Sequence, residues 1–164
     1  MIDYTKINSE TWDSWASDGC EWSLPISYEE YAKTNADNFA VYLTPCITVP
    51  HEWFGDLKDK KVLGLASGGG QQMPVFSKLG AKCTVFDYSD KQLDADRMVA
   101  EREGYSIEII KGDMSKHCHL KMRVLILFFI LCLTVMLRMF IIFGMNVTVC
   151  LKRAADCLRV LITV

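Results

Sequence analysis

Short apolar runs alternate with segments of helical periodicity from residue 60 onward. Lys61–Ala66 is apolar over most of its length and leads into glycines, a pattern typical of a buried parallel strand. Helical periodicity follows over Gln71–Leu79 and ends at Gly80. The pattern then predicts, in order, a strand at Lys82–Asp87, a helix at Asp90–Glu103 and a strand at Ser106–Lys111. This succession predicts right-handed βαβ crossovers, and therefore an α/β fold with a parallel sheet.

The first 55 residues lack this alternation and are rich in aromatic side chains. Ser27 and Glu30 have the spacing of a capping box, which predicts a helix that runs through Tyr31. Pro50 is placed to begin a short helix that carries Trp53. We expect the tryptophans here to pack in a core or under a lid rather than on a ligand: Trp12, Trp15, Trp22 and Trp53.

Charge and composition change abruptly near residue 117. The 164-residue chain has 18 Lys and Arg against 20 Asp and Glu, which gives a net charge of −2. Residues 1–116 contain 19 of the acids and 12 of the bases, whereas residues 117–164 contain one acid and six bases. All Trp, Tyr and Pro residues precede residue 117. The overall charge excludes a nucleic-acid binder that works through bulk basic charge, and the break indicates two unlike parts.

Cysteine spacing and the N-terminus bear on metal binding and location. The seven cysteines form no CxxC pair and no zinc-ligand spacing, so we expect no metal site and reduced thiols. The N-terminus has neither the basic nor the apolar region of a secretory signal. These features favour a cytoplasmic protein.

The C-terminal part is strongly apolar. Val124–Leu137 is apolar except for Thr134, and after Arg138 the apolar character continues to Leu151. A bilayer span needs about 20 apolar residues, and arginine at its middle costs at least ~2.5 kcal/mol on insertion scales. Membrane association through residues 124–151 therefore stays open as an alternative, in the form of a poorly built anchor.

Three segments place ligand-binding chemistry at the predicted carboxyl ends of the strands. Residues 64–70, here named the glycine turn, follow the first strand and allow a backbone to approach a ligand closely. Asp87 ends the second strand, 21 residues after Ala66, where an acid can accept hydrogen bonds from both ribose hydroxyls. Asp113 closes the third strand at the same edge. Together they favour an adenosine-containing ligand; the structural alternative is a tight turn, a solvated Asp87 and an Asp113 that caps a helix.

These segments resemble the class I S-adenosylmethionine-dependent methyltransferases, in particular bacterial type 11-like members, over roughly residues 55–116. The glycine turn is similar to their first motif, VFDYSDKQL to their second-strand acid and IIKGDM to their adenine-side motif. The resemblance implies a Rossmann-like fold and S-adenosylmethionine as cofactor. It implies that Asp87 holds the ribose and that Asp113 and Met114 contact the adenine, with Gly68 and Gly70 against the methionine and ribose.

The chain departs from that pattern at two positions of the glycine turn. The family usually has an acid at position 64 and glycine at 66, where Gly64 and Ala66 stand here. Gln71 and Gln72 are polar enough to replace the missing contact to the amino group of the cofactor. The full set of expected cofactor-binding residues is Gly64, Ala66, Ser67, Gly68, Gly70, Gln71, Gln72, Asp87, Tyr88, Ser89, Asp113 and Met114.

The resemblance implies three parts and one main function. We expect a helical lid at 1–55, a cofactor-binding half-domain at 56–116 and an apolar tail at 117–164. The implied function is methyl transfer from S-adenosylmethionine to an unidentified small-molecule acceptor, with no catalytic residue assigned, no nucleic-acid partner and impaired activity in this chain. The alternatives are a membrane-tethered nucleoside-binding module and an NAD-type Rossmann oxidoreductase.

The tail is interpreted as out-of-frame sequence from about His117 onward. The family continues with a fourth strand after an LPF-x-D-x-SFD segment, where this chain has HCHLKMRVLILFF. Codons rebuilt from the neighbouring frame permit LPFEDESFDLIF at this place and GGRLLAG near the end. After such a shift, a uracil at the third position of a native codon stands at the second position of the new codon. Codons with uracil at the second position encode apolar residues.

Sequencing the gene through the codons for Lys116–Leu120 tests the interpretation of the tail. We expect the downstream DNA to encode the second half of a methyltransferase in the neighbouring frame. Downstream DNA without that coding capacity would instead support a selected apolar tail.

Overall fold

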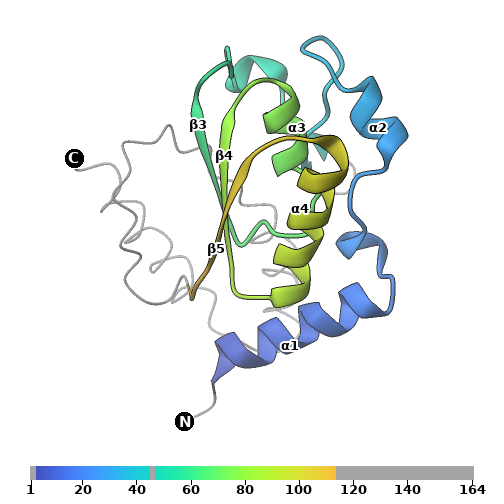
Figure 1. The fold of residues 1–164 in the computed structure, drawn as a ribbon, viewed down its shortest axis with the longest axis vertical. Coiled ribbons are helices and arrows are strands. Elements are labelled where there is room, and N and C mark those ends of the chain that lie inside the picture. Colours follow the sequence, from blue (N-terminus) through green and yellow to red (C-terminus); the bar gives the residue numbers. More distant parts are fainter. Residues whose placement is uncertain (1–2, 45–46, 114–164) are drawn as a thin grey trace, which may run out of the picture.

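A three-stranded parallel sheet forms the centre of the protein. The computed structural model describes residues 3–44 and 47–113. Within them β3 (Lys61–Leu65), β4 (Lys82–Asp87) and β5 (Ile107–Lys111) pair in parallel in the order β3-β4-β5. The connecting helices α3 (Met73–Lys78) and α4 (Asp90–Glu103) lie on one face of the sheet (Figure 1). The predicted α/β arrangement of βαβ units, consistent with a Rossmann-like fold, is confirmed.

The ends of these elements follow local chemistry. The helix expected from Gln71 begins only at Met73, because both glutamines stay in the turn and Pro74 occupies the first helical turn. Helix α4 has the predicted bounds, with Ser89 as N-cap and Gly104 in the left-handed conformation after its last residue. The last strand begins one residue later than predicted, at Ile107.

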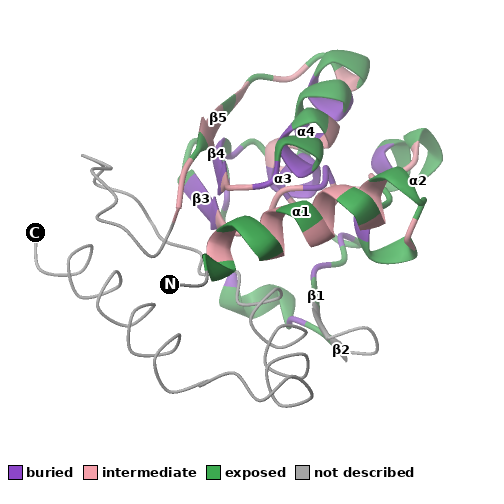
Figure 2. Cartoon of the chain, turned by 90° about the horizontal axis from the view of Figure 1, so that it is seen from below, coloured by how far each residue is buried: buried purple, intermediate pink, exposed green. Residues whose placement is uncertain are grey.

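The core lies between the sheet and its two helices, as the buried positions in Figure 2 show. Val62 and Val85 of neighbouring strands and Phe76 of α3 are fully buried. Phe39 and Phe54 from the N-terminal part pack into the same cluster. Burial of each large side chain contributes about 1.5–3 kcal/mol, so the N-terminal part and the sheet stabilise one another.

The N-terminal part contains helices, as expected, and one short sheet that the sequence pattern does not predict. Its helices are α1 (Tyr4–Ser17), η1 (Glu21–Ser23), α2 (Tyr28–Lys33) and η2 (His51–Trp53). The predicted capping box at Ser27 and Glu30 is present, and Pro50 precedes η2. Strands β1 (Tyr42–Thr44) and β2 (Ile47–Thr48) form an antiparallel pair that is too short for period-two alternation to reveal.

The expected packing of the tryptophans is only partly correct. Trp12 and Trp15 are half-buried and meet edge to face, with ring centroids 5.0 Å apart. Trp53, by contrast, is 72% exposed and Trp22 is 43% exposed, so neither is a core residue. Both belong to single-turn 3-10 helices, η2 and η1, which present side chains to solvent on the outside of the fold.

No helix of residues 3–44 and 47–113 is both long and apolar enough to cross a membrane. The apolar segment 124–151 and the whole tail from His117 lie outside the described residues, and so does Met114.

Strand β3 ends where Ala66 adopts a conformation that favours glycine. Ala66 has a φ of +46°, and its N–H donates to the carbonyl of Phe86 at 2.8 Å. An L-residue in the left-handed region costs roughly 1–2 kcal/mol, because its Cβ crowds the following carbonyl. The chain therefore carries local strain at the one position of the glycine turn where alanine replaces glycine of the resembled family.

Ala66→Gly should stabilise the protein by about 0.5–1 kcal/mol, since relief of the strain outweighs the entropy that glycine gains in the unfolded chain. Urea unfolding of the full chain measures this change. A matched control is Ala32→Gly in the exposed face of α2, which should destabilise by about 1 kcal/mol because that residue is helical. Equal losses of stability in both variants would contradict the strain at Ala66.

Candidate functional site

The predicted ligand-binding segments meet at the carboxyl ends of the three strands, here named the carboxyl rim. The strand register pairs Leu65 with Phe86 and Asp87 with Lys111. Two backbone hydrogen bonds extend this register past the strand ends, from Ala66 N–H to Phe86 O at 2.8 Å and from Gly112 N–H to Asp87 O at 2.9 Å. The glycine turn, Asp87 and residues 112–113 therefore lie side by side.

Asp87 is held by the backbone on three sides. Its Oδ1 accepts hydrogen bonds from the N–H groups of Tyr88 at 2.7 Å and Ser89 at 3.0 Å. Its Oδ2 accepts one from Gly68 N–H at 3.0 Å. A carboxylate oxygen accepts about two hydrogen bonds, so Oδ1 is filled, whereas Oδ2 accepts one from the described residues and has room for one more donor. The side chain is fixed in place and still able to accept a hydrogen bond from a ligand hydroxyl.

The environment of Asp87 opposes its negative charge. Burial raises the pKa of this carboxyl, and the amides of Ser89, Gly68 and Tyr88 counteract part of the rise. The carboxylate of Asp13 adds a smaller increase. A group that donates a hydrogen bond to Asp87 would stabilise the charged form, so the site favours a hydroxyl donor over an anionic ligand.

The glycine turn is pressed against helix α4, which explains three of its glycines. A Cβ on Gly68 would lie 2.7 Å from Gln92 Cβ, and one on Gly69 would lie 2.4 Å from Gln92 Oε1. A Cβ on Gly70 would lie 2.9 Å from the backbone oxygen of Ala95. Gly69 and Gly70 also have positive φ values, of 113° and 65°. The glycines are required by the close contact between turn and helix, in addition to any role toward a ligand.

Gly64 and Ser67 share one space. A Cβ at Gly64 would lie 1.9 Å from Ser67 Oγ, so no larger residue fits at position 64 while Ser67 keeps its rotamer. Ser67 Oγ is buried and has no hydrogen-bond partner among the described residues, and the same holds for Oε1 of Gln72. Two polar oxygens among the described residues are therefore buried without partners three and eight residues after position 64, where the resembled family carries an acid.

The other expected residues have structural partners of their own. Gln71 Nε2 donates to the carbonyl oxygens of Trp22 at 3.0 Å and Leu24 at 2.8 Å, and so attaches the N-terminal segment to the glycine turn. The carbonyl of Tyr88 accepts a hydrogen bond from Ser9 Oγ at 3.1 Å. Asp113 is the last described residue of the rim.

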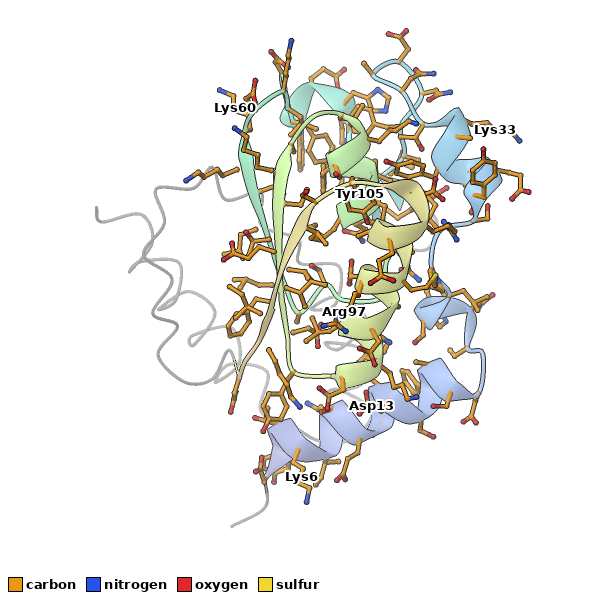
Figure 3. The ribbon with its side chains drawn as sticks, in the orientation of Figure 1. Lys6, Asp13, Lys33, Lys60, Arg97 and Tyr105 are labelled. Carbon is orange, nitrogen blue, oxygen red and sulfur yellow. The ribbon has the colours of Figure 1, made fainter. Side chains whose placement is uncertain are left out.

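Helix α1 covers the rim where β4 leads into α4 (Figures 1 and 3). Asp13 of α1 accepts hydrogen bonds from Ser89 Oγ at 2.6 Å and from Lys91 N–H at 3.0 Å. An acid is favourable at the start of a helix, because free N–H groups and the helix dipole point toward it. Helix α1 is thus anchored directly beside Asp87.

Sequence reasoning missed Asp13 and Asp96. Asp13 could not be assigned, since its contact with the start of α4 joins residues 76 or more positions apart. Asp96 left a signal, because it falls on the buried stripe of α4 together with Leu93 and Val99. An acid on the apolar face of a helix is unusual enough to mark a candidate functional or structural group.

The surface is also hollowed at the opposite, amino ends of the strands, where Lys61, Lys82 and Ile107 line a shallow depression. A second depression beside α4 is lined by Arg97 and Tyr105, among others. Neither contains a residue of the glycine turn or Asp87, so these depressions are separate from the carboxyl rim.

Two comparisons, with family models and with solved structures, do not identify the family of the chain. No family model matches the chain. Among solved structures the chain is similar to the PH0226 protein of Pyrococcus horikoshii OT3, with 30% identity and a TM-score of 0.34 over 37% of this chain and 28% of that one. A similarity this low adds nothing to the fold described above.

The sequence similarity to a Bacillus subtilis (strain 168) protein is much stronger. The chain is 45% identical over 107 residues to the uncharacterized methyltransferase YbaJ. The match takes in 65% of this chain and 42% of that protein, so the chain spans less than half the length of this relative. Over those 107 residues the chain is a homologue of a bacterial protein named as a methyltransferase.

Proposed function

We propose that the carboxyl rim binds S-adenosylmethionine and that the protein serves methyl transfer from it to a small-molecule acceptor. The observation that carries this proposal is Asp87, a half-buried carboxyl fixed by three backbone amides with one acceptor position left on Oδ2. A ribose hydroxyl is a donor of the required kind. The homology to a protein named as a methyltransferase supports the choice of ligand.

The residues of the rim fit the proposed cofactor. Asp87 would accept from the ribose, Gly68 and Gly70 would lie along the methionine and ribose, and Asp113 would bind the adenine amine. The side-chain oxygens of Ser67 and Gln72, which are buried without partners among the described residues, would accept from the amino group, in place of the acid that is absent at position 64. The bound cofactor supplies a methyl group on a sulfonium, which is electrophilic without further activation.

The described residues would contribute positioning and exclusion of water. Methyl transfer is an in-line displacement whose rate depends on holding donor and acceptor at attack distance in a dry site. The N-terminal lid would exclude water, since α1 and the segment after it are hydrogen-bonded to the rim through Asp13 and Gln71. No side chain of the described residues is assigned as a general base. As in the sequence-based expectation, we propose that the 164-residue chain transfers methyl groups poorly.

Calorimetry with S-adenosylhomocysteine tests the proposed ligand. The full chain should bind it with a dissociation constant on the order of micromolar, and Asp87→Ala should weaken binding at least about tenfold because the ribose loses its acceptor. Asp94→Ala is the matched control. Asp94 is an exposed acid of helix α4, so its substitution should leave binding unchanged.

Thermal unfolding and a second ligand make the test decisive. Asp87→Ala must show a cooperative unfolding transition before its binding is compared with that of the native chain. Binding that Asp87→Ala leaves intact would show that the rim is not the site. Tighter binding of NAD than of S-adenosylhomocysteine would favour an oxidoreductase instead.

A further inference from the structure

Helix α4 buries a carboxyl group on its inner face. Asp96 has no exposed surface and lies on the same stripe as Leu93 and Val99. A buried acid is costly unless hydrogen bonds or a partner charge compensate for the loss of water. An apolar residue would fill this position of the stripe without that cost, so the contacts of Asp96 need a specific explanation.

Asp96 contacts the glycine turn. Its Oδ2 accepts a hydrogen bond from Gly69 N–H at 2.9 Å, and the same N–H is shared with the carbonyl of Gln92 at 2.9 Å. The preceding amide, of Gly68, donates to Asp87 Oδ2. Two consecutive amides of the turn are therefore held by two different carboxyl groups, one at the end of β4 and one on α4. The other oxygen of Asp96, Oδ1, is buried without a partner among the described residues.

The environment of Asp96 disfavours its negatively charged form. Burial raises the pKa of Asp96 to about 7, the amides of Gly70 and Gly69 oppose the rise, and the nearby charge of Asp87 adds to it. Cys83 of β4, whose pKa burial raises to about 12, and Tyr105 after α4, whose pKa burial also raises, feel the charge of Asp96. None of these three neighbours is a cation, so none of them favours the charged form of Asp96.

We propose that Asp96 is a positioning residue for the glycine turn, whose buried carboxyl group holds the Gly69 amide and with it the conformation in which the turn meets a ligand. In its consequence for binding, this role rests on the proposed function of the rim. A carboxylate is a stronger hydrogen-bond acceptor than a carboxylic acid. The turn is therefore held more firmly above neutral pH than below it, and ligand affinity rises with pH.

Stability should change with pH in the opposite direction to affinity. The pKa of Asp96 in the folded chain lies above its ordinary value of 3.8, so the folded form binds more protons between these values. Its contribution to stability is greatest at low pH, falls as pH rises from about 4 to about 7, and stays low above that. Asp96→Asn, which cannot be charged, should therefore raise the unfolding temperature relative to the native chain at pH 8 more than at pH 5.

The amide resonance of Gly69 in the full chain tests the contact without any ligand. The native chain should show a titration of this resonance with a midpoint near pH 7, and Asp94→Asn, which removes an exposed acid from the same helix, should show the same titration. Asp96→Asn should abolish the titration while Gly69 keeps an acceptor. A native resonance that does not titrate, or one that still titrates in Asp96→Asn, would overturn the proposal.

Binding of S-adenosylhomocysteine tests the consequence for the site. The affinity of the native chain should rise at least about threefold from pH 6 to pH 8, and that of Asp96→Asn should stay constant. Asp96→Ala should bind more weakly than Asp96→Asn at both pH values, because it lacks the acceptor. A pH dependence that survives in Asp96→Asn would overturn the role of Asp96. Absence of binding by the native chain would instead contradict the proposed function, and the Gly69 titration would still decide the contact.

Discussion

The close contact between the glycine turn and helix α4 is the constraint on which the rest of the rim depends. The turn can approach the helix only because Gly68, Gly69 and Gly70 have no side chains, and its amides are then within reach of Asp87 and Asp96. The contact orients the carboxyl of Asp87 and buries that of Asp96. A turn with larger residues would separate these groups, and the acceptor geometry of the rim would be lost.

The N-terminal segment is attached to the same contact. The amide of Ile26 donates to the carbonyl of Gly70 at 2.9 Å, and Gln92 Nε2 donates to Ser23 Oγ at 3.0 Å. Asp13 binds the start of α4 a few residues away. The N-terminal segment is therefore hydrogen-bonded both to the glycine turn and to helix α4.

The fold and the rim could be predicted from sequence because their signals are local. Apolar runs predicted β3 and β4, and Gly104 predicted the end of α4. Each of three segments lies at the carboxyl end of one of the parallel strands, which places them at one edge of the sheet: the glycine turn, Asp87 and Asp113. The missed features depend on tertiary contacts. The anchoring of α1 by Asp13, the use of Gln71 to hold the N-terminal segment and the positive φ of Ala66 follow from the packed structure.

The central claim is that the carboxyl rim, with Asp87 and the glycine turn, is the ligand-binding site. Amide chemical-shift mapping of the full chain during titration with S-adenosylhomocysteine tests it most directly. The claim predicts that the largest changes occur at Gly68, Gly69 and the residues that follow Asp87. Changes confined to the amino ends of the strands, around Lys61 and Lys82, would contradict it, as would a spectrum that the ligand leaves unchanged.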